Sequence, residues 1–414
     1  MLVRIAARLG RCGSDFVAHG ADPGYLRLDD HARSEVERGY PPGTHATWST
    51  REHQVAGLEH DVPAGPGEQK WYHGTDRALP TSAPRPQPGK NVWVISCAQA
   101  AEGCAVPAKA IREAGTKIGW RVKIVDGQFN PSEESNGIRA AVADHADAIV
   151  VIAGDCPNTE TALEEAKKAG VILYADFSVD CNEAGAGPKL FDGHASFDAA
   201  GTPYGAYLKT IHDAVVVDWV TSKTNGTGHV LLVDETDLPN AQIEAAGYKA
   251  LFPKVCPGCK VSDVQFTGQD LISGNLKNLV AAALTRDPTI NVVVAPYDAA
   301  ITIGVGAAVQ QQAGRHILVT GYEGLSANIA QIKAGGPDNL ATGFPSQWVG
   351  WSTVDELNRI FNKQPVVDEG MGYQAIDKDH NLPAATSFYD GNVDAAGKPR
   401  QYYESNFLKI WGIG

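Results

Sequence analysis

The sequence contains no apolar run long enough to cross a membrane. Its longest apolar stretches have the length of a β-strand, whereas a transmembrane helix needs roughly 20 apolar residues in succession. An excess of basic residues is also absent, because 35 Lys and Arg stand against 48 Asp and Glu, which gives a net charge of -13. A chain of this charge repels phosphate backbones, so we expect no nucleic-acid partner.

Common catalytic motifs are missing as well. The chain has no Gly-x-Ser-x-Gly nucleophile elbow, no P-loop and no His-Glu-x-x-His pair. Gly304-Val305-Gly306 lies inside a helical pattern and not in a turn between a strand and a helix, so it cannot cradle a pyrophosphate. We therefore expect neither enzymatic activity nor a cofactor or a metal.

Between residues 91 and 344 the chain alternates short Val- and Ile-rich runs with helical patterns. The runs are continuously apolar, which is typical of parallel strands covered by helices on both faces. This alternation predicts a doubly wound α/β fold, in which ligands bind at the loops that leave the carboxyl ends of the strands. Strands are predicted at 92–96, 122–125, 148–152, 171–175, 230–233, 260–265, 292–295 and 317–320. Helices are predicted at 105–118, 132–144, 159–169, 241–252, 271–284 and 299–313.

The first 89 residues lack this alternation. Gly and Pro interrupt them, and no helical or strand period extends beyond about one turn. We predict an irregular N-terminal extension over 1–89, ending in an extended proline-rich linker. The stretch 1–10 is short and interrupted by arginine, so no export signal is visible in it.

Six of the seven cysteines fall into local pairs. Three local disulfides would indicate an oxidising, extracytoplasmic compartment. The alternatives are reduced thiols in a cytosolic protein, or a zinc site built from the first four, whose spacing fits no common zinc module. The Cys-x-x-Cys pair follows a helical pattern and precedes a strand, so we expect it to close a turn and not to act in redox catalysis. The predicted pairs are Cys97 with Cys104, Cys156 with Cys181, and Cys256 with Cys259.

Five segments, 92–96, 125–132, 148–155, 171–176 and 317–323, resemble the type I periplasmic solute-binding proteins. More narrowly they resemble the ribose and galactose binding cluster, whose core is shared with Lac-repressor-type regulators. The resemblance covers about 90–414 and implies two doubly wound parallel-sheet lobes joined by a three-strand hinge. It places 90–199 plus 345–372 in the first lobe, and 200–344 plus 373–414 in the second.

Candidate ligand-binding residues are the polar and aromatic side chains at the predicted strand ends, although any single one can instead have a structural role. In the first lobe they are Ser96, Gln99, Asp155, Asp176, Phe177, Phe197 and Asp198. In the second lobe and near the last hinge they are Gln242, Gln269, Tyr297, Asp298, Glu323, Phe344, Gln347 and Trp348. The resemblance implies ligand contacts at or next to Asp176, Gln242, Gln269, Tyr297, Glu323 and Phe344.

These candidates favour a neutral sugar or polyol as the ligand. Carboxylates and amides pair with vicinal hydroxyls, and aromatic rings cover the apolar faces of a sugar. Sugar-binding relatives usually carry an arginine after the aspartate matched by Asp176, and often another at the position of Gln242, but this chain has Phe177 and Gln242 there. Because the set contains no Lys or Arg, an acidic ligand has no obvious partner. A cationic or aromatic small molecule held by acids and aromatic rings in the same cleft is the alternative.

The expected function is an extracytoplasmic receptor, monomeric, that passes its ligand to the membrane permease of an ABC importer after hinge closure. A ligand sensor for a membrane kinase is the alternative within the receptor class. A Lac-repressor-type regulator would need a helix-turn-helix, and residues 1–60 lack its apolar periodicity and basic balance. A hydrolase would need a nucleophile with a base, for which no motif is present.

Overall fold

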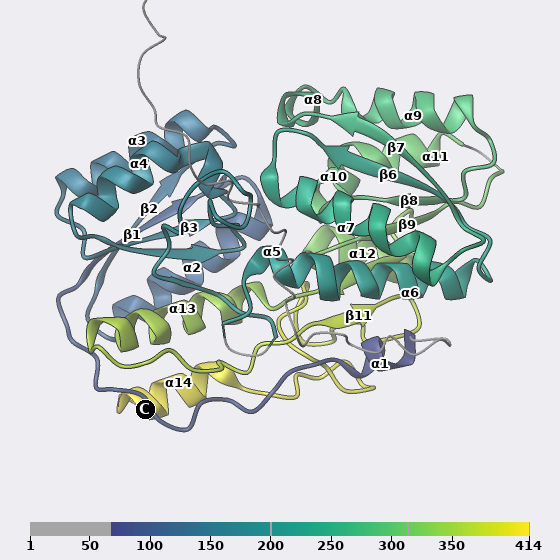
Figure 1. The fold of residues 1–414 in the computed structure, drawn as a ribbon. Coiled ribbons are helices and arrows are strands. Elements are labelled where there is room, and N and C mark those ends of the chain that lie inside the picture. The colour runs from purple at the N-terminus through teal and green to yellow at the C-terminus, as the bar shows by residue number, and fades with distance from the viewer. Residues whose placement is uncertain (1–67, 199–200, 313, 414) are drawn as a thin grey trace, which may run out of the picture. The chain divides into compact units, whose positions relative to one another are not determined.

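The structure is a computed structural model that describes residues 68–198, 201–312 and 314–413. These residues form two β-sheets, each covered by helices on both faces (Figure 1). We call the five-stranded sheet with its helices the first lobe, and the six-stranded sheet with its helices the second lobe. The predicted fold class, two doubly wound α/β lobes, is therefore confirmed.

The first lobe has the strand order β2-β1-β3-β4-β5, and all neighbouring strands are parallel. Val92 and Val94 pack in the apolar layer that contains α2, whereas Ile95 packs with α3 and α4 on the other face. Burial on both faces explains why this strand is continuously apolar. The elements are β1 (Asn91–Ser96), α2 (Glu102–Lys117), β2 (Arg121–Asp126), α3 (Pro131–Ala143), β3 (Ala148–Ile152), α4 (Cys156–Lys168), β4 (Ile172–Asp176) and β5 (Gly193–His194).

The second lobe has the strand order β11-β10-β9-β8-β6-β7, in which only β11 is antiparallel to its neighbour. Its strands are β6 (His229–Glu235), β7 (Lys260–Phe266), β8 (Val292–Val294), β9 (Leu318–Gly321), β10 (Leu340–Gly343) and β11 (Gln374–Ile376). Its helices are α5 (Tyr204–Tyr207), the π-helical η1 (Leu208–His212), α6 (Asp213–Lys223), α7 (Pro239–Val255), α8 (Gly268–Ser273), α9 (Leu276–Arg286), α10 (Asp298–Ala300), the π-helical η2 (Ile301–Val305), α11 (Gly306–Gln310) and α12 (Ser326–Ala334).

Both lobes contain the same topological switch point. The first strand of each lobe lies between the second and the third, so β1 is flanked by β2 and β3, and β6 by β7 and β8. Loops leave such a position in opposite directions and open a crevice at the carboxyl ends of the strands. Each lobe therefore offers half of a binding site.

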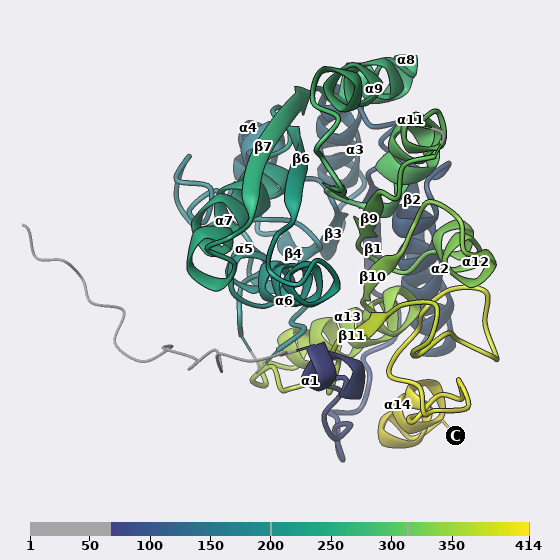
Figure 2. The same cartoon turned by 90° about the vertical axis from the view of Figure 1, so that its right-hand side faces the viewer.

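Helix α13 (Ser346–Phe361) follows β10 of the second lobe but packs against α2 of the first lobe (Figure 1 and Figure 2). A Cβ atom added at Gly350 would lie 2.5 Å from the Cβ of Ala110 and 2.7 Å from the carbonyl oxygen of Pro107. The two helix backbones thus approach more closely than any side chain at this position would allow.

The chain passes between the lobes after β5, after β10 and after α13. Two further connections lie in the described part of the chain. Residues 74–90 lead from α1 (Glu68–His73), which packs on α6 and β11, to β1. Residues 377–402 lead from β11 to α14 (Tyr403–Trp411), which packs on α13. The exact division of the chain between the lobes stays a prediction.

The N-terminal connection is bonded to the segment that follows α13. The backbone N–H of Thr75 donates to the carbonyl oxygen of Tyr373 at 3.0 Å. The Arg77 guanidinium forms an ion pair with Asp368 at 2.6 Å and also donates to the carbonyl oxygen of Asp198. Arg77 therefore joins three of the segments that run between the lobes.

All eight predicted strands are present, and the predicted helices differ in two places. Gly274 has a left-handed φ of 76°, which ends α8, so the pattern over 271–284 belongs to two helices. The pattern predicted over 299–313 is helical as far as Gln310, where α11 ends, and it changes to π-helical hydrogen bonding at 301–305. The helix α1 was not predicted, because its contacts are tertiary: the Trp71 indole N–H donates to Asp218 at 2.8 Å. Residues 1–67 of the predicted extension lie outside the described residues.

The three predicted disulfides are all present. Four of their sulfurs are the ones considered for a zinc site, so they are not available there as thiolate ligands. Cys256 and Cys259 close the turn between α7 and β7, as expected from the pattern around them.

Replacing Gly350 with Ala is expected to lower the free energy of unfolding by about 1–3 kcal/mol, because the added methyl group overpacks the contact between α2 and α13. Gly268→Ala is the control, since its Cβ would meet no atom nearer than 3.4 Å. Urea unfolding followed by tryptophan fluorescence measures both changes. Equal stability of the two variants would contradict the close approach of the helices.

Candidate functional site

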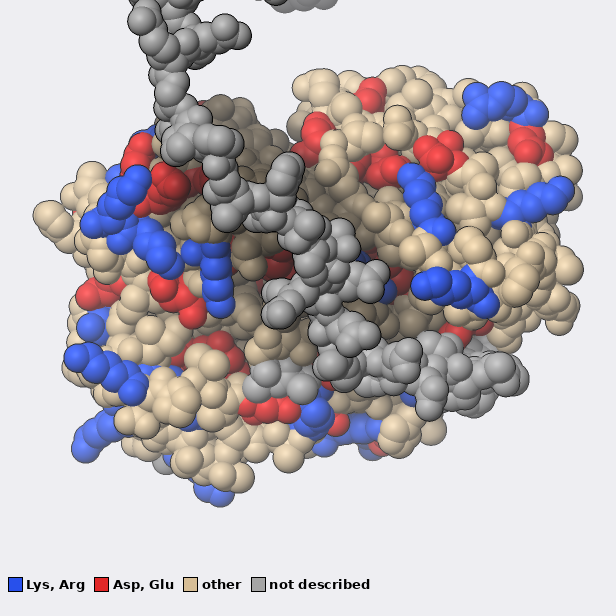
Figure 3. All heavy atoms as spheres, in the orientation of Figure 1, with Lys and Arg blue, Asp and Glu red and all other residues tan. Residues whose placement is uncertain are grey.

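A cavity of about 220 Å³ lies between the two lobes. First-lobe residues that line it follow β1, β2, β3 and β4 or belong to the first turns of α2, α3 and α4. Second-lobe residues lie at or after the ends of β6, β8, β9 and β10 or belong to α5, η1, α7, α8 and α10. Figure 3 shows this face of the molecule hollowed between the lobes. The cavity thus occupies the carboxyl-end crevices at which the sequence predicts a ligand.

Five of the fifteen candidate residues line this cavity: Asp155, Phe177, Tyr297, Glu323 and Phe344. They come from the ends of β3, β4, β8, β9 and β10, so the strand-end rule brings them together from both lobes. Their contact with a ligand stays a prediction.

Three candidates are held in buried contacts beside or behind the cavity. The Asp176 carboxylate accepts the hydroxyl of Thr353 at 2.9 Å, which fastens β4 to α13. The Asp298 carboxylate accepts three backbone N–H groups, of which that of Leu325 is at 2.8 Å. Phe197 stacks on Phe177 with 5.4 Å between ring centroids. These three side chains shape the loops that carry the lining residues.

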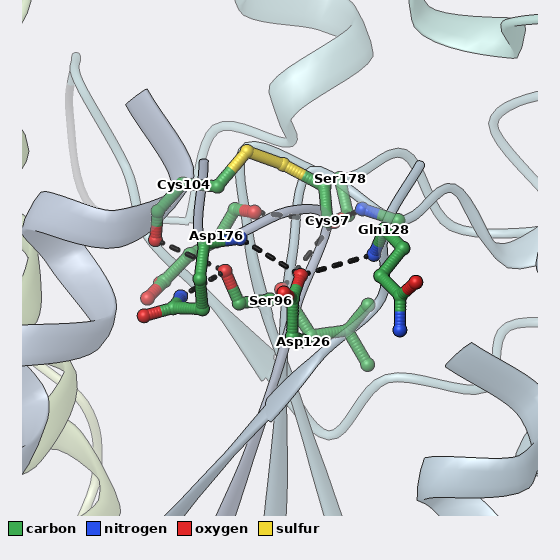
Figure 4. The surroundings of a disulfide bond; sticks show 10 residues. Ser96, Cys97, Cys104, Asp126, Gln128, Asp176 and Ser178 are labelled. Atoms are coloured by element: carbon green, nitrogen blue, oxygen red, sulfur yellow. Dashed lines mark hydrogen bonds between the residues drawn. A yellow bond between two sulfur atoms is a disulfide. The ribbon is translucent and has the colours of Figure 1, made fainter. Parts of the chain in front are cut away.

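The remaining seven candidates make other contacts. Ser96 donates to the carbonyl oxygen of Cys104 and accepts from Gln99, next to the disulfide shown in Figure 4. The carbonyl oxygen of Asp198 accepts from Arg77, and the Gln242 amide donates to the carbonyl oxygen of Thr236. Gln269 is an exposed residue of α8. The backbone N–H groups of Gln347 and Trp348 both donate to Asp390 at 3.1 Å.

The cavity contains five carboxylates that the strand-end rule missed: Glu102, Glu134, Glu235, Asp237 and Glu244. Glu102 and Glu134 lie in the first turns of α2 and α3, a place where acidic residues also stabilise a helix dipole. Because this structural role explains the two acidic residues, the sequence alone does not indicate that they also line the cavity. Together with Asp155 and Glu323 they bring the number of lining carboxylates to seven, whereas the described lining includes no Lys, Arg or His.

Two of these carboxylates connect the lobes across the cavity. Asp155 of the first lobe accepts the backbone N–H of Asn240 of the second lobe at 2.7 Å. Glu102 accepts the backbone N–H of Ser326 at 3.0 Å and its hydroxyl at 2.6 Å. Because both contacts need the lobes to be together, the structure represents a closed arrangement.

Glu134 occupies a slot between two glycines. A Cβ atom added at Gly127 would lie 2.8 Å from the Cγ of Glu134, and one added at Gly154 would lie 2.9 Å from its Oε2. The residue is only 6% exposed, and no described residue donates a hydrogen bond to its carboxyl group. The described part of the chain therefore makes room for a buried carboxylate without providing a hydrogen-bond donor to it.

Burial raises the pKa of four lining carboxyl groups to about 7. For Glu134, the nearby Asp155 raises the pKa further. For Glu235, the hydroxyl of Tyr297 donates at 2.6 Å and lowers the pKa, but burial outweighs this bond. No cation offsets the cost of desolvation within the described lining. The four groups are Glu134, Asp155, Glu235 and Glu323.

Aromatic rings form the apolar part of the lining. Phe177 and Phe344 lie 4.5 Å apart between ring centroids, and Tyr322 packs on Phe344 at 4.8 Å. Phe177 has a φ of 52° and Glu323 a φ of 52°, in the left-handed region that most side chains avoid. Such conformations cluster at binding sites, where the surrounding structure holds the backbone in place.

The disulfide between Cys97 and Cys104 also lines the cavity. It ties the residue after β1 to the first turn of α2, and Figure 4 shows Asp126 beneath it. The Asp126 carboxylate accepts the backbone N–H groups of Gln99 at 2.9 Å and Gln128 at 3.1 Å. The loops after β1 and β2 are thereby fixed at the cavity wall.

Two groups of side chains in the described residues have atoms close enough to share a metal ion. In one, Cys156 and Cys181 are joined in a disulfide. In the other, His212 lies 3.1 Å from Glu244. Burial opposes a charge on His212, but Glu244 and Asp213 outweigh it and raise the pKa of the imidazole to about 9. A protonated imidazole has no free lone pair for a metal, so this group is best described as an ion pair.

Residues 94–365 match the family model of the periplasmic binding protein domain. The match covers more than half of the chain, which therefore belongs to the periplasmic binding protein family. The resemblance to type I solute-binding proteins is confirmed. No curated protein matches the chain. None of the described helices is long and apolar enough to cross a membrane.

Solved structures of this fold resemble the chain at low sequence identity. A galactofuranose binding protein is 18% identical with a TM-score of 0.57, over 70% of this chain and 95% of that chain. A solute binding protein from Actinobacillus succinogenes with bound D-allose is 17% identical with a TM-score of 0.57, over 70% and 98%. One from Agrobacterium vitis with bound allitol is 14% identical with a TM-score of 0.59, over 70% and 96%. At these identities the likeness concerns the fold.

The ligand-free protein is expected to be more stable at pH 5 than at pH 8. Folding raises the pKa values of the cavity carboxyl groups, so the folded state holds more protons than the unfolded chain in this range, and stability falls as pH rises. The free energy of unfolding should fall by at least about 2 kcal/mol, the amount expected from one such carboxyl group. Urea unfolding at the two pH values measures it. If the free energy of unfolding were constant or increased from pH 5 to pH 8, the raised pKa values of the cavity carboxyl groups would be contradicted.

Proposed function

We propose that this protein is the extracytoplasmic receptor of an ABC importer and captures a small hydroxylated solute, a sugar or polyol, in the cavity between its lobes. The observation that carries the proposal is a cavity lined from both lobes by carboxylates and aromatic rings. Carboxylates accept hydrogen bonds from vicinal hydroxyls, and rings cover the C–H faces of such ligands. Membership of the family supports the proposal, as do neighbours with bound D-allose and allitol.

Closure of the lobes is the proposed mechanism. The bonds from Asp155 to Asn240 and from Glu102 to Ser326 exist only when the lobes meet. A ligand that contacts both lobes adds to these bonds, so it shifts the population from open to closed. The permease would recognise the closed form. Binding without chemical conversion is sufficient for this role.

The cysteine content supports a location outside the cytoplasm. Three disulfides bind six cysteines in the described residues, and such bonds persist in oxidising compartments. We infer that the receptor acts as a monomer, since each chain provides both lobes of the cavity.

The function is tested by a thermal-shift screen over sugars, polyols, amines and aromatic acids, followed by calorimetry. A hydroxylated ligand at 100 times its Kd should stabilise the protein by about 2.7 kcal/mol, with one ligand bound per chain. Unchanged ligand recovered after incubation would support binding without catalysis. Stabilisation by acidic ligands alone, or conversion of the ligand, would contradict the proposal.

Replacing Asp155 with Ala is expected to weaken ligand binding by about 10- to 100-fold, because a charge-assisted hydrogen bond between the lobes contributes about 1.5–3 kcal/mol to closure. Calorimetry measures the affinity. Asp263→Ala is the control, as Asp263 is an exposed carboxylate of β7 that does not line the cavity. Urea unfolding of both variants separates a folding defect from lost closure. Equal affinity of the folded variants would contradict the role of Asp155.

A further inference from the structure

We infer that the hydroxylated ligand also carries a protonated amine, and that the carboxylate of Glu134 binds this amine inside the cavity. The inference rests on the proposed function, because it names the chemical class of solute that the same cavity takes. That class is an amino sugar or an amino polyol.

The first observation is the imbalance of charge in the cavity. Seven carboxylates line it, and none of the described lining residues is cationic. Some of the seven have partners in the protein. Glu102 is bonded to Ser326, Glu244 pairs with His212, and Asp237 accepts the backbone N–H of Gly268 at 2.9 Å. No cationic side chain of the described lining neutralises the others, so in their ionised form they favour a cationic ligand.

The second observation is the position of Glu134. Its side chain is buried between Gly127 and Gly154, it lines the cavity, and no described residue donates to its carboxyl group. Burying an ionised carboxylate without a partner is unfavourable. The nearby Asp155 adds repulsion and no hydrogen bond. Glu134 is therefore the lining carboxylate that gains most from a bound cation.

An ammonium group fits this position better than a hydroxyl group. It supplies three hydrogen-bond donors and a full positive charge, whereas a hydroxyl group supplies one donor and carries no charge. Burial raises the pKa of Glu134 to about 7, so a cation next to it restores the ionised form. The rings of Phe177, Phe344 and Tyr322 line the same cavity. Aromatic rings attract cations through their electron-rich faces.

The test compares matched pairs of ligands on the full chain by calorimetry at pH 7. D-galactosamine is paired with D-galactose, and glucamine with sorbitol, so that each pair differs by an amine in place of a hydroxyl. N-acetyl-D-galactosamine is the third arm, because it keeps the nitrogen and loses the charge. In at least one pair the amine should bind 10-fold or more tightly than the hydroxyl compound, and the acetylated form should lose this advantage.

The variant Glu134→Gln is expected to reduce the preference for the amine, measured as the ratio of the two affinities within a pair, to 3-fold or less. Glu133→Gln is the matched control, since it removes the same charge from the exposed neighbouring position of α3 and should keep the preference. If Glu134→Gln does not fold, the inference is tested by comparing the affinities of the amine, hydroxyl and acetylated ligands for the unaltered chain.

Tight binding of the hydroxyl compounds without preference for the amines would overturn this inference and leave the proposed function standing. A preference that persists in Glu134→Gln would also overturn it. If no member of either pair binds, the inference fails, and the thermal-shift screen over the wider set of sugars and polyols decides the proposed function separately.

Discussion

Desolvation of carboxyl groups inside the cavity between the lobes is the constraint on which the other properties of this protein depend. Glu134, Asp155 and Glu235 are buried there, Glu323 is half-buried, and the described lining offers no cationic side chain. Their charge is unfavourable in a closed, empty cavity and favourable around a ligand that donates hydrogen bonds. Closure without a ligand is therefore unfavourable, which is consistent with the proposed closure of the lobes around a solute.

The cavity between the lobes results from the similar topology of the two lobes. Both sheets have the same order of their first strands, so each lobe has a crevice at the carboxyl ends of its strands. The chain contributes polar residues to both crevices, and Asp155 and Glu102 contact backbone N–H groups of the opposite lobe. Arg77 bonds to segments that run between the lobes and so fixes the hinge from outside the cavity.

Much of the fold could be predicted from the sequence, because strands buried on both faces are continuously apolar and stand out locally. The strand-end rule likewise located the cavity and found Asp155, Tyr297 and Glu323. It could not show that Asp176 is bonded to Thr353, since that contact joins residues far apart in the chain. It also missed Glu134, which lies in the first turn of α3. An acidic residue at that position is already explained by its favourable interaction with the helix dipole. Residues of this kind become visible only when burial and partners are known.

The most direct test of the central claim is a crystal structure of the protein with the ligand that binds most tightly in calorimetry. We expect the ligand to occupy the interlobe cavity and to donate hydrogen bonds to carboxylates of both lobes, with Glu134 and Glu235 on opposite sides. A ligand bound outside this cavity, or one that contacts a single lobe, would contradict it.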